Sequence, residues 1–318
     1  MTQLAPQHPP GRWGRRRDWL LGFAVLALLV TAVELSIGWS TLLAPWREVA
    51  PLHLAGVLTF TALSYVLRAG RLRTILQPFG IRHFPLLLRL TIFHNVANNL
   101  LPMRSGELVF PWLLQRYFGS NLLTAITTLI WLRLFDLHCL VLIALAIVNL
   151  REPTLVGGMS AAVWLASLGL IPQLQRLHTA HRLRGDGRLR RVLRQAVQTA
   201  PQHWWLIARL YGWTLFIWSF KFAAFVSLLH FFLPLAYWQL WFAVLGAELS
   251  SVLPVHGIAG SGSYELAMVA ALTPLGIAPQ LALAGAVNLH LFLLGSTVLL
   301  GALGLLIPVN NRTERHAN

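Results

Sequence analysis

Long apolar runs constrain the fold of this chain more than any other feature of its sequence. Three of them cover residues 19–38, 122–150 and 281–307. A helix needs roughly 20 apolar residues to cross the hydrocarbon core of a bilayer. Because lipid cannot satisfy backbone N–H and C=O groups, only helices and closed barrels span a membrane. Continuous runs of this length predict an all-α, polytopic integral membrane bundle.

The charge composition supports this class of protein. Only 11% of the 318 residues are charged, whereas soluble domains contain about 25%. The formal net charge is +15, but the basic residues lie in short segments between the apolar runs, as the positive-inside rule describes. Since no basic soluble domain is present, we expect no nucleic acid among the partners.

The apolar runs predict about six full spans and two re-entrant hairpins. The spans cover residues 19–40, 50–69, 122–149, 154–172, 205–233 and 279–307. Four shorter apolar segments form two adjacent pairs, 84–101 with 104–118 and 238–254 with 262–276. A 15-residue helix reaches only about 22 Å, less than the core thickness of roughly 30 Å. We therefore expect each pair to form a re-entrant hairpin, with two full crossings per pair as the alternative.

Both pairs contain the same kind of backbone break, in which Leu-Pro is followed by glycine and then by a glutamate. The residues are Pro102, Gly106 and Glu107 in the first pair, and Pro254, Gly257, Gly260, Gly262 and Glu265 in the second. Such backbone is tolerated at membrane depth only where protein buries it or where it lines a cavity. Broken segments at corresponding positions of two halves are the best sequence indicator of a transporter's central site.

The distribution of arginine predicts the orientation of the spans. Arginines concentrate before the first span, at 68–82 after the second span, in the 173–203 loop and at the C-terminus. The positive-inside rule therefore places both termini and the long loop in the cytoplasm. In this orientation the unit 50–149 starts outside, and the similar unit 205–307 starts inside. We infer an inverted repeat, which transporters use for alternating access about a midplane site.

These features divide the chain into five parts. They are a cytoplasmic basic tail (1–18), a first membrane half (19–172), a cytoplasmic loop (173–203), a second membrane half (204–309) and a cytoplasmic tail (310–318). Apolar residues recur at helical spacing from Leu189 to Ala200, opposite arginines and glutamines. They predict a basic amphipathic helix on the anionic inner leaflet, although a solvated linker explains the same arginines.

Seven ionisable residues lie inside the predicted membrane segments. They are Arg104, Glu107, Arg133, Asp136, Lys221, Glu248 and Glu265. An intramembrane charge is costly and indicates a functional site by default. Arg133 and Asp136 are three residues apart, so they share one face of a helix. Structural ion pairs between helices are the alternative, but two of the charges adjoin broken backbone, where such a pair has less reason to lie.

An arginine in a cavity is a good anion receptor, because its planar fork binds phosphate oxygens in pairs and keeps its charge. We expect Arg104 and Arg133 to hold a phospholipid or polyprenyl-phosphate headgroup. Glu107 would tune the site or bind a cationic headgroup, and Asp136 and Glu265 would balance charge. The sign of the substrate's charge stays open on these residues alone.

The second half holds the candidates for energy coupling. Glu248 and Glu265 have only Lys221 to balance them, with His256 and His290 nearby in the sequence. A carboxyl group that keeps its proton would suit proton coupling through Lys221, Glu248 and His256. A carboxylic acid hydrogen-bonded to freed backbone fits these residues equally well.

No metal site or cofactor is expected. His178 and His181 lie in the basic loop without carboxylates at ligand spacing. The single cysteine, Cys139, lies in an apolar run and is expected to be a small core residue. We also interpret His94 and His290 as core histidines rather than ligands.

The broken segments, taken in order, resemble the flippase-like transmembrane domain of the lysylphosphatidylglycerol synthase family. The resemblance rests on Asn98–Leu108, Thr127–Asp136 and the glycine-rich stretch Leu253–Glu265, and it covers residues 15–307. It implies a bacterial inner-membrane domain that moves lipids between leaflets. The residues to which it gives a role are Pro102, Arg104, Gly106, Glu107, Arg133, Asp136, Pro254, Gly260, Gly262 and Glu265.

The sequence departs from the family pattern in two places. Phe110 and Pro111 stand where the family often has an arginine, and no synthase domain is evident. Aminoacyl transfer is therefore not implied, and we expect a protein that is not an enzyme.

The expected function is that of a flippase-like transporter for a phospholipid, polyprenyl-linked lipid or glycolipid. The expected partners are membrane lipids with anionic or lipid-phosphate headgroups, together with lipid-synthesis enzymes encoded nearby. A scaffold in a lipid or hopanoid synthesis complex is one alternative. A membrane-embedded lipid-linked transferase is the other.

Overall fold

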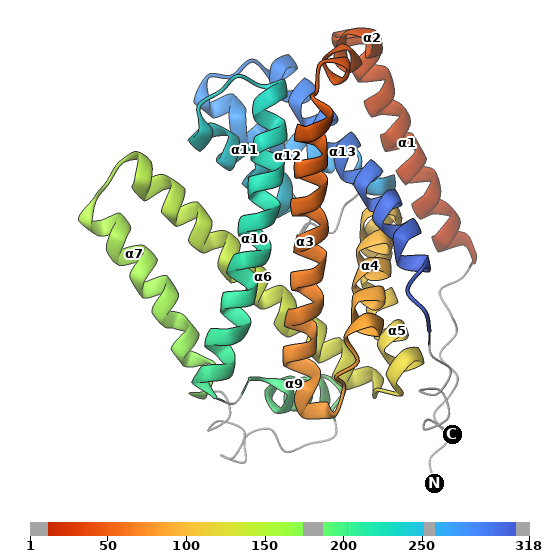
Figure 1. Ribbon diagram of the computed structural model, residues 1–318, viewed down its shortest axis with the longest axis vertical. Coiled ribbons are helices and arrows are strands. Elements are labelled where there is room, and N and C mark those ends of the chain that lie inside the picture. The colour runs from red at the N-terminus through yellow and green to blue at the C-terminus, as the bar shows by residue number, and fades with distance from the viewer. Residues whose placement is uncertain (1–11, 174–186, 202, 251–257, 310–318) are drawn as a thin grey trace.

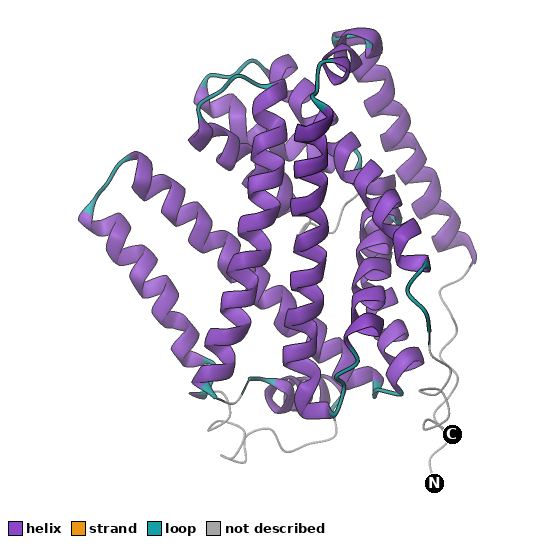
Figure 2. Cartoon of the chain, viewed as in Figure 1, coloured by secondary structure: helices purple, strands orange, loops and turns teal. Residues whose placement is uncertain are grey.

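The computed structural model describes residues 12–173, 187–201, 203–250 and 258–309 (Figure 1). Within these ranges the chain forms α-helices and short 3₁₀ helices, without a strand (Figure 2). The α-helices are α1 (Arg12–Ser36), α2 (Trp39–Leu43), α3 (Pro51–Leu76), α4 (Phe84–Leu100), α5 (Val109–Phe118), α6 (Leu122–Arg151), α7 (Leu155–Ala166), α9 (Arg188–Thr199), α10 (Trp204–Phe232), α11 (Tyr237–Ser250), α12 (Ser263–Leu272) and α13 (Pro279–Leu305). The 3₁₀ helices are η1 (Ala44–Arg47), η2 (Gln77–Phe79), η3 (Pro102–Leu108), η4 (Ser167–Leu170), η5 (Ile258–Gly260) and η6 (Thr273–Leu275). The predicted all-helical membrane class is confirmed.

Four helices of the described part are long and apolar enough to cross a membrane. They are Pro51–Phe79, Leu122–Arg151, Trp204–Phe232 and Pro279–Leu305. The first predicted span appears as a pair, Leu26–Ser36 and Trp39–Arg47, bent by 90°. The predicted span 154–172 is a shorter apolar helix, Leu155–Leu170. The structure thus contains a helix for each of the six predicted spans, and four of these helices are both long and apolar enough for a full crossing.

Helix ends follow from local sequence. α6 begins where the Asn121 side chain accepts a hydrogen bond from the Leu123 N–H, at 2.8 Å. α7 begins where the Thr154 hydroxyl accepts one from the Gly157 N–H, at 3.0 Å. Such side chains satisfy N–H groups that the first helical turn leaves without partners. α5 ends at Gly119, whose φ of 63° lies in the left-handed region that glycine adopts without strain.

Two hairpins of short helices pack against the long ones. α4 and α5 are joined by η3, and α11 packs closely on α12. α4 has 17 residues and α5 has 10, so neither approaches the length of the long helices. The first hairpin lies toward the end of the molecule that carries α9, and the second lies toward the opposite end (Figure 1). Their tips meet, because η3 contacts η5, and α1 contacts both tips.

The two halves have opposite directions, as the sequence predicted. α3 runs toward the α9 end, α10 runs away from it, and the two helices lie side by side (Figure 1). Each is followed by a hairpin and then by another long helix, α6 or α13. This arrangement is that of an inverted repeat, in which a site forms where the two repeats meet.

Small residues allow the second hairpin and the last helix to pack closely. A Cβ on Gly246 of α11 would lie 2.8 Å from the Ala271 Cβ of α12. A Cβ on Gly304 of α13 would lie 2.8 Å from a methyl carbon of Ile92 on α4. Lipid provides no hydrophobic drive for helix association, so close packing at small residues stabilises these contacts.

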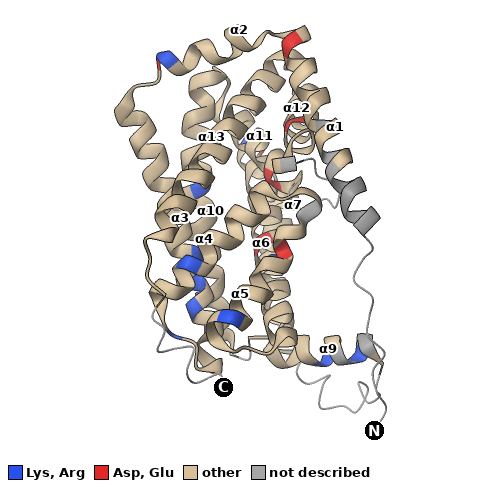
Figure 3. Cartoon of the chain, turned by 90° about the vertical axis from the view of Figure 1, so that its right-hand side faces the viewer, with Lys and Arg blue, Asp and Glu red and all other residues tan. Residues whose placement is uncertain are grey.

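The predicted amphipathic segment in the long loop is helical and forms α9. The Trp131 Nε1–H of α6 donates to the Ala196 carbonyl oxygen at 2.8 Å, and Gln195 Nε2 donates to Thr124 Oγ1 at 3.2 Å. α9 is therefore docked on the first half of α6. The described lysines and arginines gather mainly toward this end of the bundle (Figure 3).

The predicted position of two arginines relative to the second span was wrong. Arg68 and Arg71 do not follow the second span but lie within α3, which continues to Leu76. Arg71 is only 4% exposed and is paired with Asp136. An ion pair makes a buried charge tolerable inside a membrane, and the helix therefore continues past both arginines. Arg73 and Arg82 remain exposed at that end.

Candidate functional site

A cavity of about 410 Å³ lies between the two halves of the bundle. Its walls come from α3, α4, η3, α6, α10 and α11. The lining residues include three cations, three carboxylates and three asparagines, which are Arg68, Arg133, Lys221, Glu107, Asp136, Glu248, Asn95, Asn98 and Asn99. The cavity therefore joins intramembrane charges from the first hairpin tip and from four helices.

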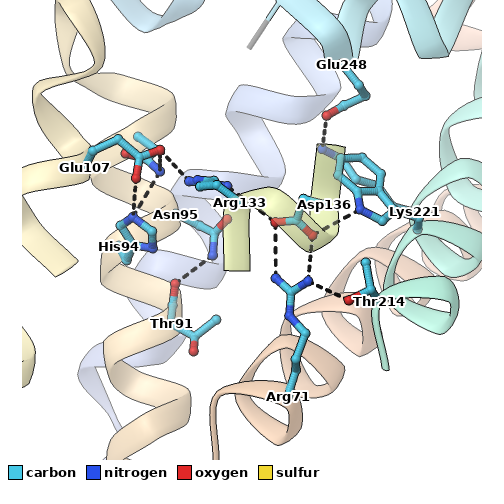
Figure 4. Close-up of polar contacts among 12 residues, drawn as sticks. Arg71, Thr91, His94, Asn95, Glu107, Arg133, Asp136, Thr214, Lys221 and Glu248 are labelled. Carbon is cyan, nitrogen blue, oxygen red and sulfur yellow. Dashed lines mark hydrogen bonds and ion pairs between the residues drawn. The ribbon is translucent and has the colours of Figure 1, made fainter. Parts of the chain in front are cut away.

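Glu107 faces this cavity from the first broken segment. Its Oε1 accepts from Arg133 Nη2 at 2.5 Å and from Asn98 Nδ2 at 3.3 Å. His94 Nε2 lies 3.5 Å from Oε2. Figure 4 shows Arg133 extended between Glu107 and Asp136. The Arg133 side chain is 40% exposed, so this pair is within reach of a ligand.

Asp136 is held in a buried network. Arg71 Nη1 and Nη2 donate to its two oxygens at 2.6 and 3.2 Å, and Trp218 Nε1 donates at 3.1 Å. Arg133 Nη1 lies 3.7 Å away. Arg71 also donates to Thr214 Oγ1 at 2.9 Å (Figure 4). With these donors Asp136 orients Arg71, Trp218 and Arg133, and its geometry favours positioning over direct ligand binding.

Lys221 and Glu248 form the third ion pair of the cavity. Lys221 Nζ lies 2.6 Å from Glu248 Oε2. The ammonium group also lies 5.3 Å from the Trp218 ring centroid and 5.1 Å from that of Phe225, within the range of cation–π attraction. These two predicted coupling residues are therefore joined, and both line the cavity.

Arg68 is a lining residue that the sequence analysis did not propose. Its guanidinium carbon lies 5.5 Å from the Trp218 ring centroid. Among the described residues it makes no ion pair or hydrogen bond. Arg68 and Arg71 are three apart, which is the same helical spacing that identified Arg133 and Asp136. That spacing was a usable signal, but both arginines were counted as following the second span rather than as part of one helix.

The asparagines of α4 were also missed. Asn95, Asn98 and Asn99 fall at positions i, i+3 and i+4, which is one face of a helix. Asn98 donates to Glu107, and Asn99 Nδ2 donates to Thr297 Oγ1 of α13 at 2.8 Å. Polar residues on a single helical face within a predicted hairpin could have indicated this wall of the cavity.

Glu265 does not line the cavity. Its side chain is 2% exposed, and its Oε1 lies 2.6 Å from His290 Nδ1. Its Oε2 accepts from the Gly262 N–H at 2.8 Å, and His290 Nε2 lies 2.8 Å from the Ala259 carbonyl oxygen. Glu265 thus binds the backbone of the second tip and joins α12 to α13. The geometry favours a structural role over the predicted contact with substrate.

The predicted backbone breaks are present where the chain is described. Pro102 and Gly106 lie in the 3₁₀ segment η3, and Gly260 and Gly262 have φ values of 78° and 84°. A Cβ on Gly106 would lie 2.4 Å from the Asn98 backbone nitrogen, so only glycine fits there. The Arg104 side chain lies outside the described part, as do Pro254, His256 and Gly257.

The predicted core histidines are buried but have polar partners. His94 is near Glu107, and His290 pairs with Glu265. Cys139 is a free, buried cysteine, as predicted. The described residues contain no group of three or more His, Cys, Asp or Glu that could hold a metal ion.

One comparison with known proteins identifies the family to which this chain belongs. The family described as the lysylphosphatidylglycerol synthase TM region matches residues 19–301, which include both hairpins and every lining residue of the cavity. A search of curated proteins finds no match. The match indicates a role connected with membrane lipids, and the chain belongs to the family of lysylphosphatidylglycerol synthase transmembrane regions.

Proposed function

We propose that this protein is a flippase-like transporter of the bacterial inner membrane that passes a lipid headgroup through the central cavity. The observation that carries the proposal is the charged cavity of about 410 Å³ beside the first broken segment, close to where the two hairpin tips meet. Its volume lies within the range of about 300–1,000 Å³ that is usual for ligand sites. Helices held together only by structural ion pairs would be expected to close such a space.

The ion pairs offer a chemical route for a headgroup. A polar headgroup that leaves water must exchange its hydration for other hydrogen bonds and charges. Arg133 has both Glu107 and Asp136 within 4 Å, so it can transfer part of its bonding to a phosphate while Asp136 still balances it. The exposure of Arg133 and the neighbouring asparagines supports this exchange.

The arrangement of the halves supports alternating access. The hairpins lie toward opposite ends of the bundle and touch at their tips (Figure 1). A small displacement of one tip against the other would open the cavity toward one membrane face at a time, as in other inverted-repeat transporters. The cytoplasmic location of the α9 end, which follows from its basic residues, is part of the proposal.

Reconstitution into liposomes tests the proposal. Purified protein should speed the exchange of fluorescent phospholipids between leaflets, measured by quenching the outer leaflet with dithionite. The double variant Glu107→Gln, Arg133→Gln removes both charges but leaves the net charge unchanged, and both new side chains can still form hydrogen bonds. We expect it to reduce the exchange rate by about tenfold or more, because bonds to charged groups are the stronger ones.

The matched control is the double variant Arg151→Gln, Glu152→Gln. It removes an exposed ion pair, with a separation of 3.6 Å, at the end of α6, and should leave exchange unchanged. Wild-type exchange no faster than in protein-free liposomes, across phospholipid, glycolipid and polyprenyl-phosphate probes, would contradict transport. A stoichiometric lipid-synthesis enzyme that copurifies would then favour the scaffold alternative.

A further inference from the structure

The charges around the cavity do not balance among the described side chains. Three carboxylates, Glu107, Asp136 and Glu248, face four cations, Arg68, Arg71, Arg133 and Lys221. Each carboxylate has a close cationic partner, which is Arg133, Arg71 or Lys221 respectively. Four cations and three anions leave one positive charge without a close carboxylate among the described residues, and Arg68 carries this charge.

Among the described residues, no carboxylate forms a hydrogen bond or ion pair with the guanidinium of Arg68. It lies over the Trp218 ring, and Trp218 is itself fixed by its hydrogen bond to Asp136. A guanidinium carries five N–H donors in a planar fork that matches phosphate oxygens. An arginine inside a membrane normally pairs with an acidic group or lies on an ion pathway. Arg68 therefore presents to the cavity an oriented cation whose N–H donors no described side chain occupies.

Part of the cavity wall is apolar and reaches the outside of the bundle. It consists of α6 residues at helical spacing, which are Leu129, Ile130, Leu134, Leu137 and Leu140. Leu134 is 48% exposed, and Ile130 and Leu137 are each 39% exposed. In a membrane this exposed strip of α6 would contact lipid chains. The cavity thus joins a charged interior to a surface that hydrocarbon covers.

We propose that Arg68 is the residue that selects a lipid headgroup with one net negative charge, such as a phosphodiester without an amine. The headgroup would lie in the cavity against Arg68, and its chains would lie along Ile130, Leu134 and Leu137. A cavity of about 410 Å³ has room for a headgroup but not for a whole two-chain lipid. The inference rests on the proposed function in taking the ligand to be a lipid that enters from the side.

Arg73 offers a matched control for Arg68. It lies on the same helix, five residues further along, carries the same charge and is exposed outside the cavity. Arg68→Gln and Arg73→Gln therefore remove equal charge from α3 at two different places. Since Arg68 has no carboxylate partner among the described residues, its loss should leave the thermal stability of the lipid-free protein unchanged. Arg68→Lys keeps the charge but loses the planar fork.

Binding is measured with detergent-solubilised protein by native mass spectrometry or by lipid-induced thermal stabilisation. The wild type should prefer phosphatidylglycerol over phosphatidylcholine by about tenfold or more, as a charge-assisted hydrogen bond predicts. Arg68→Gln should lose this preference, Arg68→Lys should keep part of it, and Arg73→Gln should keep all of it. Glycerophosphoglycerol, the phosphodiester headgroup without chains, should bind much more weakly than phosphatidylglycerol.

The outcomes separate this inference from the proposed function. An unchanged headgroup preference in a folded Arg68→Gln protein would overturn it, even if the protein transports lipids. Equal binding of glycerophosphoglycerol and phosphatidylglycerol would overturn the lateral lipid site in favour of a soluble phosphate diester. Arg68-dependent binding without any leaflet exchange would support the inference while contradicting the transporter.

Discussion

The two hairpin tips use the same sequence pattern in different ways. In both, Leu-Pro and glycine precede a glutamate. Glu107 in the first tip has a side chain that is 23% exposed, and it faces the cavity beside Arg133. Glu265 in the second tip is closed off and bonded to backbone and to His290. The comparison indicates that the first repeat supplies a charge that faces a ligand. The second supplies a structural anchor, in which Glu265 and His290 bind each other and the backbone of Gly262 and Ala259.

The anchor of the second tip is neutral as a unit. The Ala259 carbonyl can only accept, so His290 Nε2 must carry a hydrogen to make its 2.8 Å contact. The 2.6 Å contact between His290 Nδ1 and Glu265 Oε1 then contains one proton. Wherever that proton lies, the pair has no net charge. At the first tip, by contrast, Glu107 accepts from an arginine that keeps its charge, and this difference can be tested by substitution.

Removing the anchor should have the largest effect on stability. Glu265→Ala leaves His290 and the Gly262 N–H buried without their acceptor. A buried polar group left without its partner costs about 1–3 kcal/mol, so the two groups together cost about 2–6 kcal/mol. We expect that loss in the free energy of unfolding, measured by denaturation in mixed micelles. Glu107→Ala should cost less, because its carboxylate is partly exposed. Equal losses for the two variants would contradict the distinction between the tips.

Alanine substitutions at the glycines of the two tips should have the next largest effects on stability, and these effects should differ between the tips. A Cβ on Gly106 would lie 2.4 Å from backbone atoms of Ala97 and Asn98, so Gly106→Ala must displace η3 from α4. Such overpacking costs about 1–3 kcal/mol. A Cβ on Gly260 would meet the His290 ring at an ordinary contact distance of 3.6 Å. The cost of Gly260→Ala is therefore only that of placing alanine in the left-handed conformation, about 1–2 kcal/mol.

The same denaturation assay compares the two alanine variants. Leaflet exchange should separate them more clearly, because displaced η3 backbone carries Glu107 away from Arg133. We expect slower exchange for Gly106→Ala than for Gly260→Ala at equal protein stability. The reverse order would show that the second tip, rather than the first, controls the cavity.

The sequence was sufficient for the parts of the fold that depend on local pattern. Apolar length predicted the long helices, proline and glycine predicted both breaks, and helical spacing predicted α9 and the shared face of Arg133 and Asp136. Partner identity was out of reach, because it depends on contacts between distant segments. Arg71 pairs with Asp136 and Glu265 pairs with His290 across 65 and 25 residues. Without those pairs the second span seemed to end before Arg71, and Glu265 seemed to be a binding residue.

The smallest effect is expected from the isosteric change Glu265→Gln. The glutamine carbonyl can accept from the Gly262 N–H, and its amide can donate to the free Nδ1 of a neutral His290. Every bond of the anchor is then retained without a net charge, so the free energy of unfolding should fall by about 1 kcal/mol or less. Leaflet exchange should also stay near the wild-type rate.

Glu107→Gln provides the matching change at the first tip, where the amide removes the charge that faces Arg133. Here we expect stability to be retained but exchange to fall by about tenfold, since a charge-assisted bond is replaced by a weaker one. If instead Glu265→Gln were as destabilising as Glu265→Ala, His290 would need a full negative charge beside it. The second tip would then be an ion pair like the first, and the asymmetry between the repeats would lie only in their exposure.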